Sequence, residues 1–433
     1  MVEEYSGIPD EIRTFFEGDY GQTLLIKGMP GTGKTAFALT LLSTLKGNGA
    51  YLSTRVDPET LYQQHPWIKD EIAADNILDA TQSERERATR TQTITIKPLK
   101  YTHVPDFLKA VYIRTEKMTK PIVIIDSWDA VASYTGYYEQ REREKLEHNL
   151  CDFSRKTKTK IILLVEYTGQ AALDYLVDGV ILVESDLYSE RRLRRMIMQK
   201  LRGCQISNPV CLFSLDNGMF KAFTEFKGMA LESENPSLSD PLPDPGELMI
   251  STGLKDLDQV INGYGSCNLF EGDYITYDIL ARALSINALN LGRHLILTST
   301  KQKEFIHRII PYVKAEYKEN IAVVEDIQNL KARIKGEKDV VLLNLAEMED
   351  VDTAVKEVLA SIEDQSCVAL CFGGEEGGKG KELSSVASTQ IKTKFISGIP
   401  CFFGEMPRTE IYAMEMEPPA QRGFPAISLT PIV

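Results

Sequence analysis

The segment Gly28–Thr35 restricts the fold of this chain more than any other, because it requires a strand before it and a helix after it. It reads Gly-Met-Pro-Gly-Thr-Gly-Lys-Thr and follows the apolar run 22–28. A helical pattern begins near Lys34 and continues to Gly47. Glycines let such a loop wrap closely around an anion, with backbone N–H groups directed at it. The sequence therefore predicts an α/β domain with a phosphate-binding loop (P-loop).

The P-loop pattern assigns a role to each polar side chain in it. Lys34 is expected to reach the β- and γ-phosphates of ATP, and the Thr35 hydroxyl to bind Mg²⁺. A second Mg²⁺ anchor is expected at Asp126, which ends the apolar run 121–125, although a capping role for it stays open. The predicted nucleotide-binding residues are Gly28, Pro30, Gly31, Thr32, Gly33, Lys34, Thr35 and Asp126.

Composition excludes several classes of protein. The chain has 433 residues, 43% hydrophobic and 26% charged, which is typical of a globular protein with two or three domains. No apolar run approaches the ~18 residues of a membrane span, and the start of the chain shows no signal peptide. A net charge of −13 disfavours indiscriminate nucleic-acid binding, although a local basic patch could still bind one. Seven scattered cysteines without zinc-site spacing indicate reduced thiols, and we expect a cytoplasmic protein.

The chain divides into two halves around a proline-rich segment. Residues 229–247 contain four prolines among serines and acids, which predicts a linker between domains 1–228 and 248–433. Both halves alternate strand-like apolar runs with helical patterns, as parallel α/β units do. The predicted strands are 22–28, 50–54, 121–127, 160–166 and 179–184 in the first half, and 267–272, 294–299, 321–326, 339–345 and 367–372 in the second.

The two halves share similar openings, which indicates an internal duplication. Ser6–Asp10 and Thr252–Asp256 both precede a short amphipathic stretch and then a strand. In the second half, the first strand is followed by Gly272–Asp278, which has no lysine and carries two aspartates, and Asn344 stands where Asp126 stands in the first. We expect a degenerate copy without a nucleotide.

The sequence 373–380 spells GxxxxGK but follows a late strand, so a surface loop is expected. The tail from Glu415 to Val433 is expected to be irregular.

Two further features suggest catalytic side chains. The run 191–203 is rich in arginine, and as a strand it would place Arg194, Met196, Met198, Lys200 and Arg202 on one face, opposite Leu193, Ile197 and Leu201. Lys200 and Arg202 could converge on a phosphate, in many cases one held by a neighbouring subunit; a solvated edge or a partner-binding patch stays open. Glu166 ends a strand and could activate water, or simply be solvated.

The order of P-loop, Asp126, Asp178–Ile181 and Lys200–Gly203 resembles the KaiC/RadA branch of the RecA-like ATPases. Within it, residues 51–59 resemble archaeal proteins of the gas-vesicle regulator GvpD type. The resemblance implies a RecA-like, mostly parallel sheet flanked by helices, and bound ATP and Mg²⁺. It also implies a homo-oligomeric ring, with a hexamer among the sizes left open, in which Lys200 and Arg202 reach the neighbouring subunit's γ-phosphate.

One departure from the KaiC pattern bears on activity. KaiC-type domains place two glutamates after the second strand, where this chain has Thr54 and Arg55. Arginine cannot act as a base, so we expect weak ATPase activity (ATP and water to ADP and phosphate).

The leading hypothesis is an ATP-gated regulatory or assembly protein with a protein partner. A DNA-binding RadA paralogue and a non-hydrolysing transcriptional regulator stay open. The stretch Ser83–Thr95 is expected to form an exposed loop, at a ring pore or elsewhere.

Overall fold

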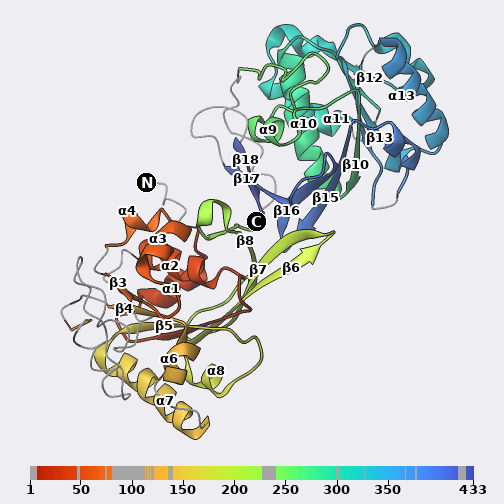
Figure 1. Cartoon of the computed structure of the whole chain (residues 1–433). Helices are drawn as coiled ribbons and strands as arrows, with labels where there is room; N and C mark the ends of the chain where they lie inside the picture. The colour runs from red at the N-terminus through yellow and green to blue at the C-terminus, as the bar shows by residue number, and fades with distance from the viewer. Residues whose placement is uncertain are drawn as a thin grey trace. The chain divides into compact units, whose positions relative to one another are not determined.

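A computed structural model shows two compact units, Met1–Phe223 with Ile432–Val433, and Thr224–Pro431 (Figure 1). The structure describes residues 7–45, 49–73, 76–79, 121–134, 140–226, 240–298, 302–325, 327–365, 367–375, 378–417 and 426–433, with the single positions 113, 115, 116 and 118. Each unit has its own sheet and its own apolar clusters on both faces of that sheet.

The first unit is built on a sheet whose described residues form nine strands, in the order β3-β2-β4-β5-β1-β6-β7-β8-β9. The strands from β3 to β6 are parallel and the pairs from β6 to β9 are antiparallel. Their bounds are β1 Thr23–Lys27, β2 Gly49–Ser53, β3 Ile77–Asp79, β4 Ile122–Asp126, β5 Lys160–Val165, β6 Gly179–Tyr188, β7 Arg191–Leu201, β8 Val210–Ser214 and β9 Lys221–Ala222.

Helices cover both faces of the first sheet because its central strands are apolar on both sides (Figure 1). Leu24 and Ile26 pack in one cluster, while Leu25, between them, packs in the other. The first cluster includes residues of α1 Asp10–Glu17, α2 Lys34–Thr44, α3 Pro58–Gln64 and α4 Ile68–Glu71, and the second those of α6 Trp128–Tyr134, α7 Gln140–Thr157 and α8 Ala172–Leu176.

The second unit repeats the topology of the first. Among the residues described, its nine strands follow the order β12-β11-β13-β14-β10-β15-β16-β17-β18, which matches the first sheet position by position. Six of these strands are again parallel and the last pairs antiparallel. Their bounds are β10 Cys267–Gly272, β11 Leu295–Leu297, β12 Ile321–Val323, β13 Val340–Asn344, β14 Val368–Phe372, β15 Thr389–Ile396, β16 Ile399–Met406, β17 Tyr412–Glu417 and β18 Ala426–Pro431.

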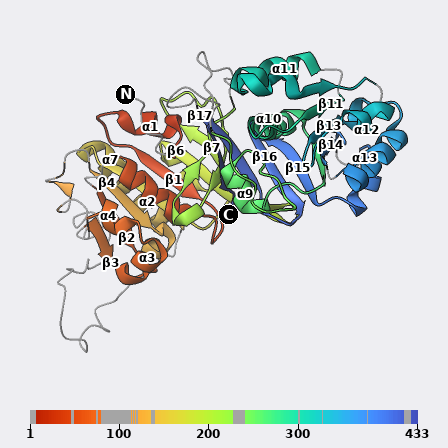
Figure 2. The same ribbon diagram turned by 90° about the horizontal axis from the view of Figure 1, so that it is seen from above.

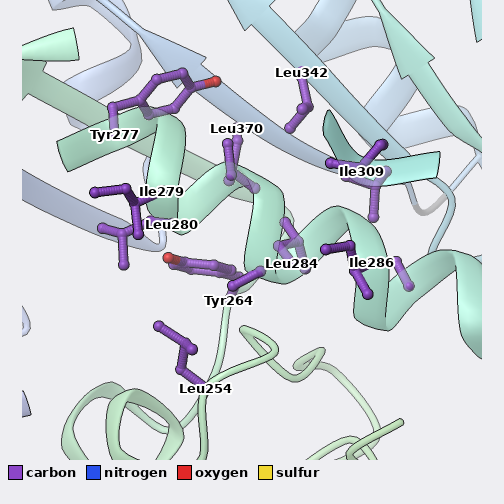
Figure 3. Packing of buried hydrophobic residues seen from close by; sticks show 14 of the residues in the cluster. Leu254, Tyr264, Tyr277, Ile279, Leu280, Leu284, Ile286, Ile309, Leu342 and Leu370 are labelled. Atoms are coloured by element: carbon purple, nitrogen blue, oxygen red, sulfur yellow. The ribbon is translucent and has the colours of Figure 1, made fainter. Parts of the chain in front are cut away.

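Helix α10, Tyr274–Asn290, is the centre of the second unit's core. Figure 3 shows Tyr277, Leu280 and Leu284 of this helix among side chains from the sheet and from α11. The helices α12 and α13 pack on the other face, which Figure 2 shows on the side of the sheet away from α11. The remaining helices of this unit are α9 Lys255–Ile261, α11 Gln302–Ile309, α12 Leu330–Arg333 and α13 Val351–Gln365.

These observations test the expectations drawn from sequence. The RecA-like, duplicated α/β fold is confirmed, and each of the ten predicted strands overlaps a strand of the structure. The expectation of an irregular tail is wrong for its described part, because Tyr412–Glu417 pairs with Ala426–Pro431. The boundaries 1–228 and 248–433 stay predictions, since residues 229–239 of the expected linker and the stretch Ser83–Thr95 lie outside the described residues.

Residues 240–247 of the expected linker are part of the second unit. The backbone N–H of Leu242 donates to Asn287 of α10 (2.7 Å). Asp244 accepts from Arg293 (2.6 Å) and Lys338 (2.9 Å), and these contacts hold its pKa below the usual range although burial raises it.

Candidate functional site

The loop Gly28–Gly33 connects β1 to α2 in a conformation that depends on its glycines. Gly28, Gly31 and Gly33 all have positive φ angles (156°, 78° and 105°), which disfavour other residues. A Cβ atom on Gly28 would lie 2.4 Å from the carbonyl oxygen of Val183 in β6, and one on Gly33 would lie 2.8 Å from Leu215. A Cβ on Gly31 would meet no atom within 4 Å. The first and last of these glycines therefore also serve close packing.

The loop leaves backbone donors available at its centre. Within the described part of the chain, the N–H groups of Gly31, Gly33 and Lys34 make no hydrogen bond, and that of Thr32 makes a long one to Met29 (3.4 Å). Such donors at a helix N-terminus favour an anion. The Lys34 ammonium is buried and donates to the carbonyl oxygens of Gly28 (2.7 Å) and Met29 (2.8 Å). Burial is the main cause that lowers its pKa, against nearby carboxylates that raise it.

The side chains predicted to hold Mg²⁺ lie together. The Thr35 hydroxyl donates to Asp126 Oδ2 (2.7 Å), and Tyr51, a residue that sequence reasoning did not assign to the site, donates to the same oxygen (2.5 Å). Burial and the Asp126 carboxylate raise the pKa of Tyr51 well above its usual range, so its hydroxyl stays protonated. A hydroxyl and a carboxylate are oxygen ligands of the kind that Mg²⁺ takes, and the site fits that ion.

Thr54 ties the ends of β2 and β4 together beneath this pair. Its backbone N–H (2.8 Å) and its hydroxyl (2.9 Å) donate to the carbonyl oxygen of Asp126, and its hydroxyl accepts from the N–H of Ser127 (2.9 Å). The sequence motif could not reveal this, because the residues are more than 70 positions apart and meet only through sheet pairing.

A match with a known family falls on this same region. Residues 12–201 match the family model described as GvpD gas vesicle protein, P-loop domain. This segment is similar to the GvpD P-loop domain. Two curated relatives from Halobacterium salinarum, Protein GvpD2 and Protein GvpD1, are 32% and 29% identical over 269 residues, which is 60% of this chain. The alignments cover 53% and 49% of those proteins, so the chain spans about half the length of the curated relatives that it matches.

In the first unit, Glu166 forms an ion pair. Arg55, at the place where KaiC-type domains have glutamates, donates to the Glu166 carboxylate. Both side chains are partly exposed, and both influence the pKa of Lys34, which places the pair at the P-loop. The Glu166 N–H donates to Asp129 (3.1 Å), whose carboxylate is paired with Arg143 (2.9 Å). The role of Glu166 in activating water stays a prediction.

Lys200 and Arg202 lie away from the P-loop of their own domain. Lys200 donates to the carbonyl oxygens of Asp174 (2.9 Å) and Val177 (2.6 Å), and Arg202 to the carboxylate of Asp178 (3.2 Å) and the carbonyl of Tyr175 (3.0 Å). Both therefore contact the segment that connects α8 to β6. Their role toward a neighbouring subunit stays a prediction.

The expectation that Lys200 lies on the same face of β7 as Met196 and Met198 is wrong. A register shift pairs Ile181 with Met198 and Val180 with Lys200, so one extra residue stands between them. Leu201 consequently joins Met196 and Met198 in the core, and Lys200 leaves that face. A bulge of this kind has no signal in the hydrophobic pattern of a single strand.

The second unit has no P-loop between its first strand and the helix that follows, a stretch that the structure describes in full. One residue, Asp273, separates β10 from α10, whereas six residues separate β1 from α2. The Asp273 carboxylate caps the helix by accepting from the N–H of Thr276 (2.9 Å). Asn344 ends β13 where Asp126 ends β4, and in the described residues its buried Oδ1 has no hydrogen-bond partner. The predicted second copy of the fold, without a loop between its first strand and helix, is confirmed, and its failure to bind a nucleotide stays a prediction.

The GxxxxGK segment of the second unit follows a late strand of that unit. Its Lys379 donates to the carbonyl oxygens of Met348 (2.6 Å) and Ala346 (3.4 Å). No helix in the described chain is long and apolar enough to span a membrane.

Proposed function

We propose that this protein is a nucleotide-gated regulatory protein that binds one ATP with Mg²⁺ in its first unit and hydrolyses it slowly. The observation that carries the proposal is the P-loop, whose free N–H groups lie beside Lys34 and the paired Thr35 and Asp126. Phosphate oxygens would replace the carbonyls that Lys34 now contacts. Thr35 and Asp126 would hold Mg²⁺, which neutralises charge on the phosphates when bound.

Slow hydrolysis follows from the ion pair between Arg55 and Glu166. A general base must be free to accept a proton from water, and the Glu166 carboxylate is instead engaged by the Arg55 guanidinium. Tyr51 orients Asp126 and has its hydroxyl engaged there, so it is no better placed to act as a base. This arrangement favours a protein that switches state on binding ATP and turns over rarely.

Assembly with other copies is the proposed output of the switch. Lys200 and Arg202 would contact the γ-phosphate held by the next copy in a ring, and the second unit would serve assembly or contact with a protein partner. The family description names a gas vesicle protein. We therefore place the regulated process in gas-vesicle formation, in the cytoplasm, for a chain that aligns with about half of its curated relatives.

Calorimetry with MgATP tests the binding step. Wild type should bind one nucleotide per chain, and Lys34→Ala should bind about 100-fold more weakly, because a charged donor to phosphate is lost. Lys379→Ala is the matched control, since it removes the lysine of the other GxxxxGK segment and should leave affinity unchanged. Two nucleotides per chain, none, or an unaffected Lys34→Ala variant would contradict the proposal.

Mass measured by light scattering tests the assembly step. We expect the mass of wild type to rise with MgATP and that of a Lys200→Ala, Arg202→Ala double variant to stay low while its nucleotide affinity persists. A wild-type mass that is the same with and without nucleotide would contradict assembly and leave nucleotide binding intact.

A further inference from the structure

Arg194 of β7 is the member of the arginine-rich run that contacts the P-loop. Its guanidinium Nη1 donates to the carbonyl oxygens of Thr32 (3.0 Å) and Gly31 (3.3 Å). The side chain is buried, and it also donates to the main-chain oxygen of Val433, which belongs to the same compact unit. Sequence reasoning placed Arg194 on a strand face but gave it no role in the site.

The neighbouring arginines make different contacts. Arg192 is exposed and donates to the hydroxyl of Ser185 (3.2 Å), while Arg195 pairs with Asp186 and Glu184 of β6. Arg192 and Arg195 therefore act on the hairpin surface, and they offer matched controls for any effect of removing an arginine.

The geometry of the peptide unit gives the Arg194 contacts a consequence for the loop. The carbonyl of Gly31 shares a planar trans peptide with the N–H of Thr32, and the carbonyl of Thr32 shares one with the N–H of Gly33, so each N–H points opposite to its carbonyl. A guanidinium that holds both carbonyls on one side therefore turns both N–H groups to the other. The N–H of Gly33, one of the unbonded donors described above, is oriented in this way.

Charge adds to this geometric effect. Burial, with a smaller contribution from Arg192, lowers the pKa of Arg194 to about 10, so the group remains charged at neutral pH. Among the residues described, no aspartate or glutamate side chain forms an ion pair with it. A buried cation is costly, and an anion bound on the loop would offset part of that cost.

We propose that Arg194 is a positioning residue for the P-loop: it fixes the Gly31 and Thr32 peptides so that their N–H partners face the phosphates, and it links the loop to the β6–β7 hairpin. The inference rests on the proposed nucleotide binding. Because coupling between two sites is reciprocal, a nucleotide on the loop stabilises the hairpin around Arg194 as much as the hairpin stabilises the loop.

Hydrogen exchange of the nucleotide-free protein tests the positioning role without any ligand. In Arg194→Gln, the hydrogen-bonded amides of Thr32 and Phe37, whose acceptors Met29 and Gly33 belong to the loop, should exchange several-fold faster than in wild type, while Arg192→Gln should leave them unchanged. Affinity for MgATP, measured on the same variants, should fall about 10-fold for Arg194→Gln and stay at the wild-type value for Arg192→Gln. Bound MgATP should slow exchange in the hairpin of wild type but not of Arg194→Gln.

The outcomes separate the possible failures. Arg194→Lys keeps the charge and a donor, and it replaces Arg194→Gln in the experiment if that variant does not fold. Its amide exchange rates and its MgATP affinity should lie between those of wild type and Arg194→Gln. A variant that lacks Val433 removes that contact of Arg194 and keeps the arginine. If this variant shows the same change in exchange and affinity as Arg194→Gln, the inference is overturned. Wild-type exchange and affinity in a folded Arg194 variant would also overturn it. If wild type binds no nucleotide, the proposed function fails, while the exchange of the ligand-free loop still decides the role of Arg194.

Discussion

The two units of this protein share one strand order but differ in the short segment after their first strand. In the first unit this segment is a six-residue loop with free N–H groups, and in the second it is part of a helix. Helix α2 has 11 residues and α10 has 17. The comparison teaches that the sheet topology does not depend on the nucleotide site, since the fold persists where the loop is gone.

The comparison also distinguishes glycines that are required for strand packing from glycines that are available to contact a ligand. Gly28 directly follows β1 and Gly272 is the last residue of β10, and both have positive φ. A Cβ at either position would collide with a carbonyl oxygen of the next strand, at 2.4 Å from Val183 and at 1.8 Å from Thr393. The second unit keeps this glycine without a P-loop. The first glycine of the motif therefore serves strand packing, whereas Gly31, which faces open space, is free to serve the ligand.

The largest expected effect concerns the buried ion pair that the second unit places near the start of α10. Arg282 and Asp278 are both buried and paired, with Arg308 3.9 Å from the same carboxylate. Arg282→Met should destabilise the second unit by about 3 kcal/mol, because it leaves a buried carboxylate poorly compensated. Both tryptophans, Trp67 and Trp128, lie in the first unit, so unfolding seen by circular dichroism but not by tryptophan fluorescence reports the second unit.

The pH dependence of that destabilisation has a definite sign. Burial raises the pKa of Asp278 above its ordinary value. An acid whose pKa is higher in the folded state contributes stability below its unfolded pKa of about 4, and this is lost as pH rises through the folded pKa. Arg282→Met raises that pKa further, so the loss above pH 4 should grow, and adding Asp278→Asn should remove it. An unchanged slope of stability against pH would contradict this assignment.

Glycine substitutions sharpen the contrast between packing and binding. Gly272→Ala should destabilise the second unit by about 2 kcal/mol or more, since both the backbone angle and the clash oppose alanine. Gly31→Ala has the angle alone to overcome and should cost about 1 kcal/mol, with a larger loss in MgATP affinity than in stability. Denaturant unfolding with the two probes above measures each; equal costs at the two positions would contradict the distinction.

Asp126 of the first unit and Asn344 of the second end equivalent strands. Substituting each by the other's residue type tests whether the proposed Mg²⁺ anchor is the only difference that gives one unit a nucleotide site. Asp126→Asn should weaken MgATP binding about 10-fold while affecting Mg²⁺-free nucleotide far less, because the carboxylate acts through the ion. Asn344→Asp should give the second unit no nucleotide site, because α10 fills the place of the loop. A second bound nucleotide in calorimetry of Asn344→Asp would break the comparison.

The smallest expected effect on stability comes from the exposed pair at the P-loop. Arg55→Ala should change the free energy of unfolding by less than about 1 kcal/mol, as is usual for exposed ion pairs. It should raise the rate of ATP hydrolysis by releasing Glu166, and Glu166→Gln on that background should cancel the gain. A phosphate-release assay measures both, and a rate unaffected by Arg55→Ala would rule out the pair as the cause of slow hydrolysis.

Sequence predicted the parallel half of each sheet well because those strands are apolar on both faces. It also located the P-loop and Asp126, since their roles require a fixed spacing from a strand and a helix. Two parallel strands, β3 and β15, and the antiparallel strands of the second unit were not predicted: β15, for example, alternates buried and half-buried residues as an ordinary amphipathic segment does. Tyr51 and Arg194 join the P-loop region through sheet pairing and long side chains, for which a linear motif carries no signal.

Helix α10 makes the difference between the units hard to reverse. Tyr277 stacks on Phe372 with ring centroids 4.8 Å apart, and Tyr274 lies edge-on to the same ring at 5.4 Å. A nucleotide pocket could return only if nearly two turns of helix unwound, these rings found another place and several glycines arose together. Each of those steps alone would weaken the domain before any ligand could compensate. Helix α10 thus fixes the second unit in a form that has no room for a P-loop after its first strand.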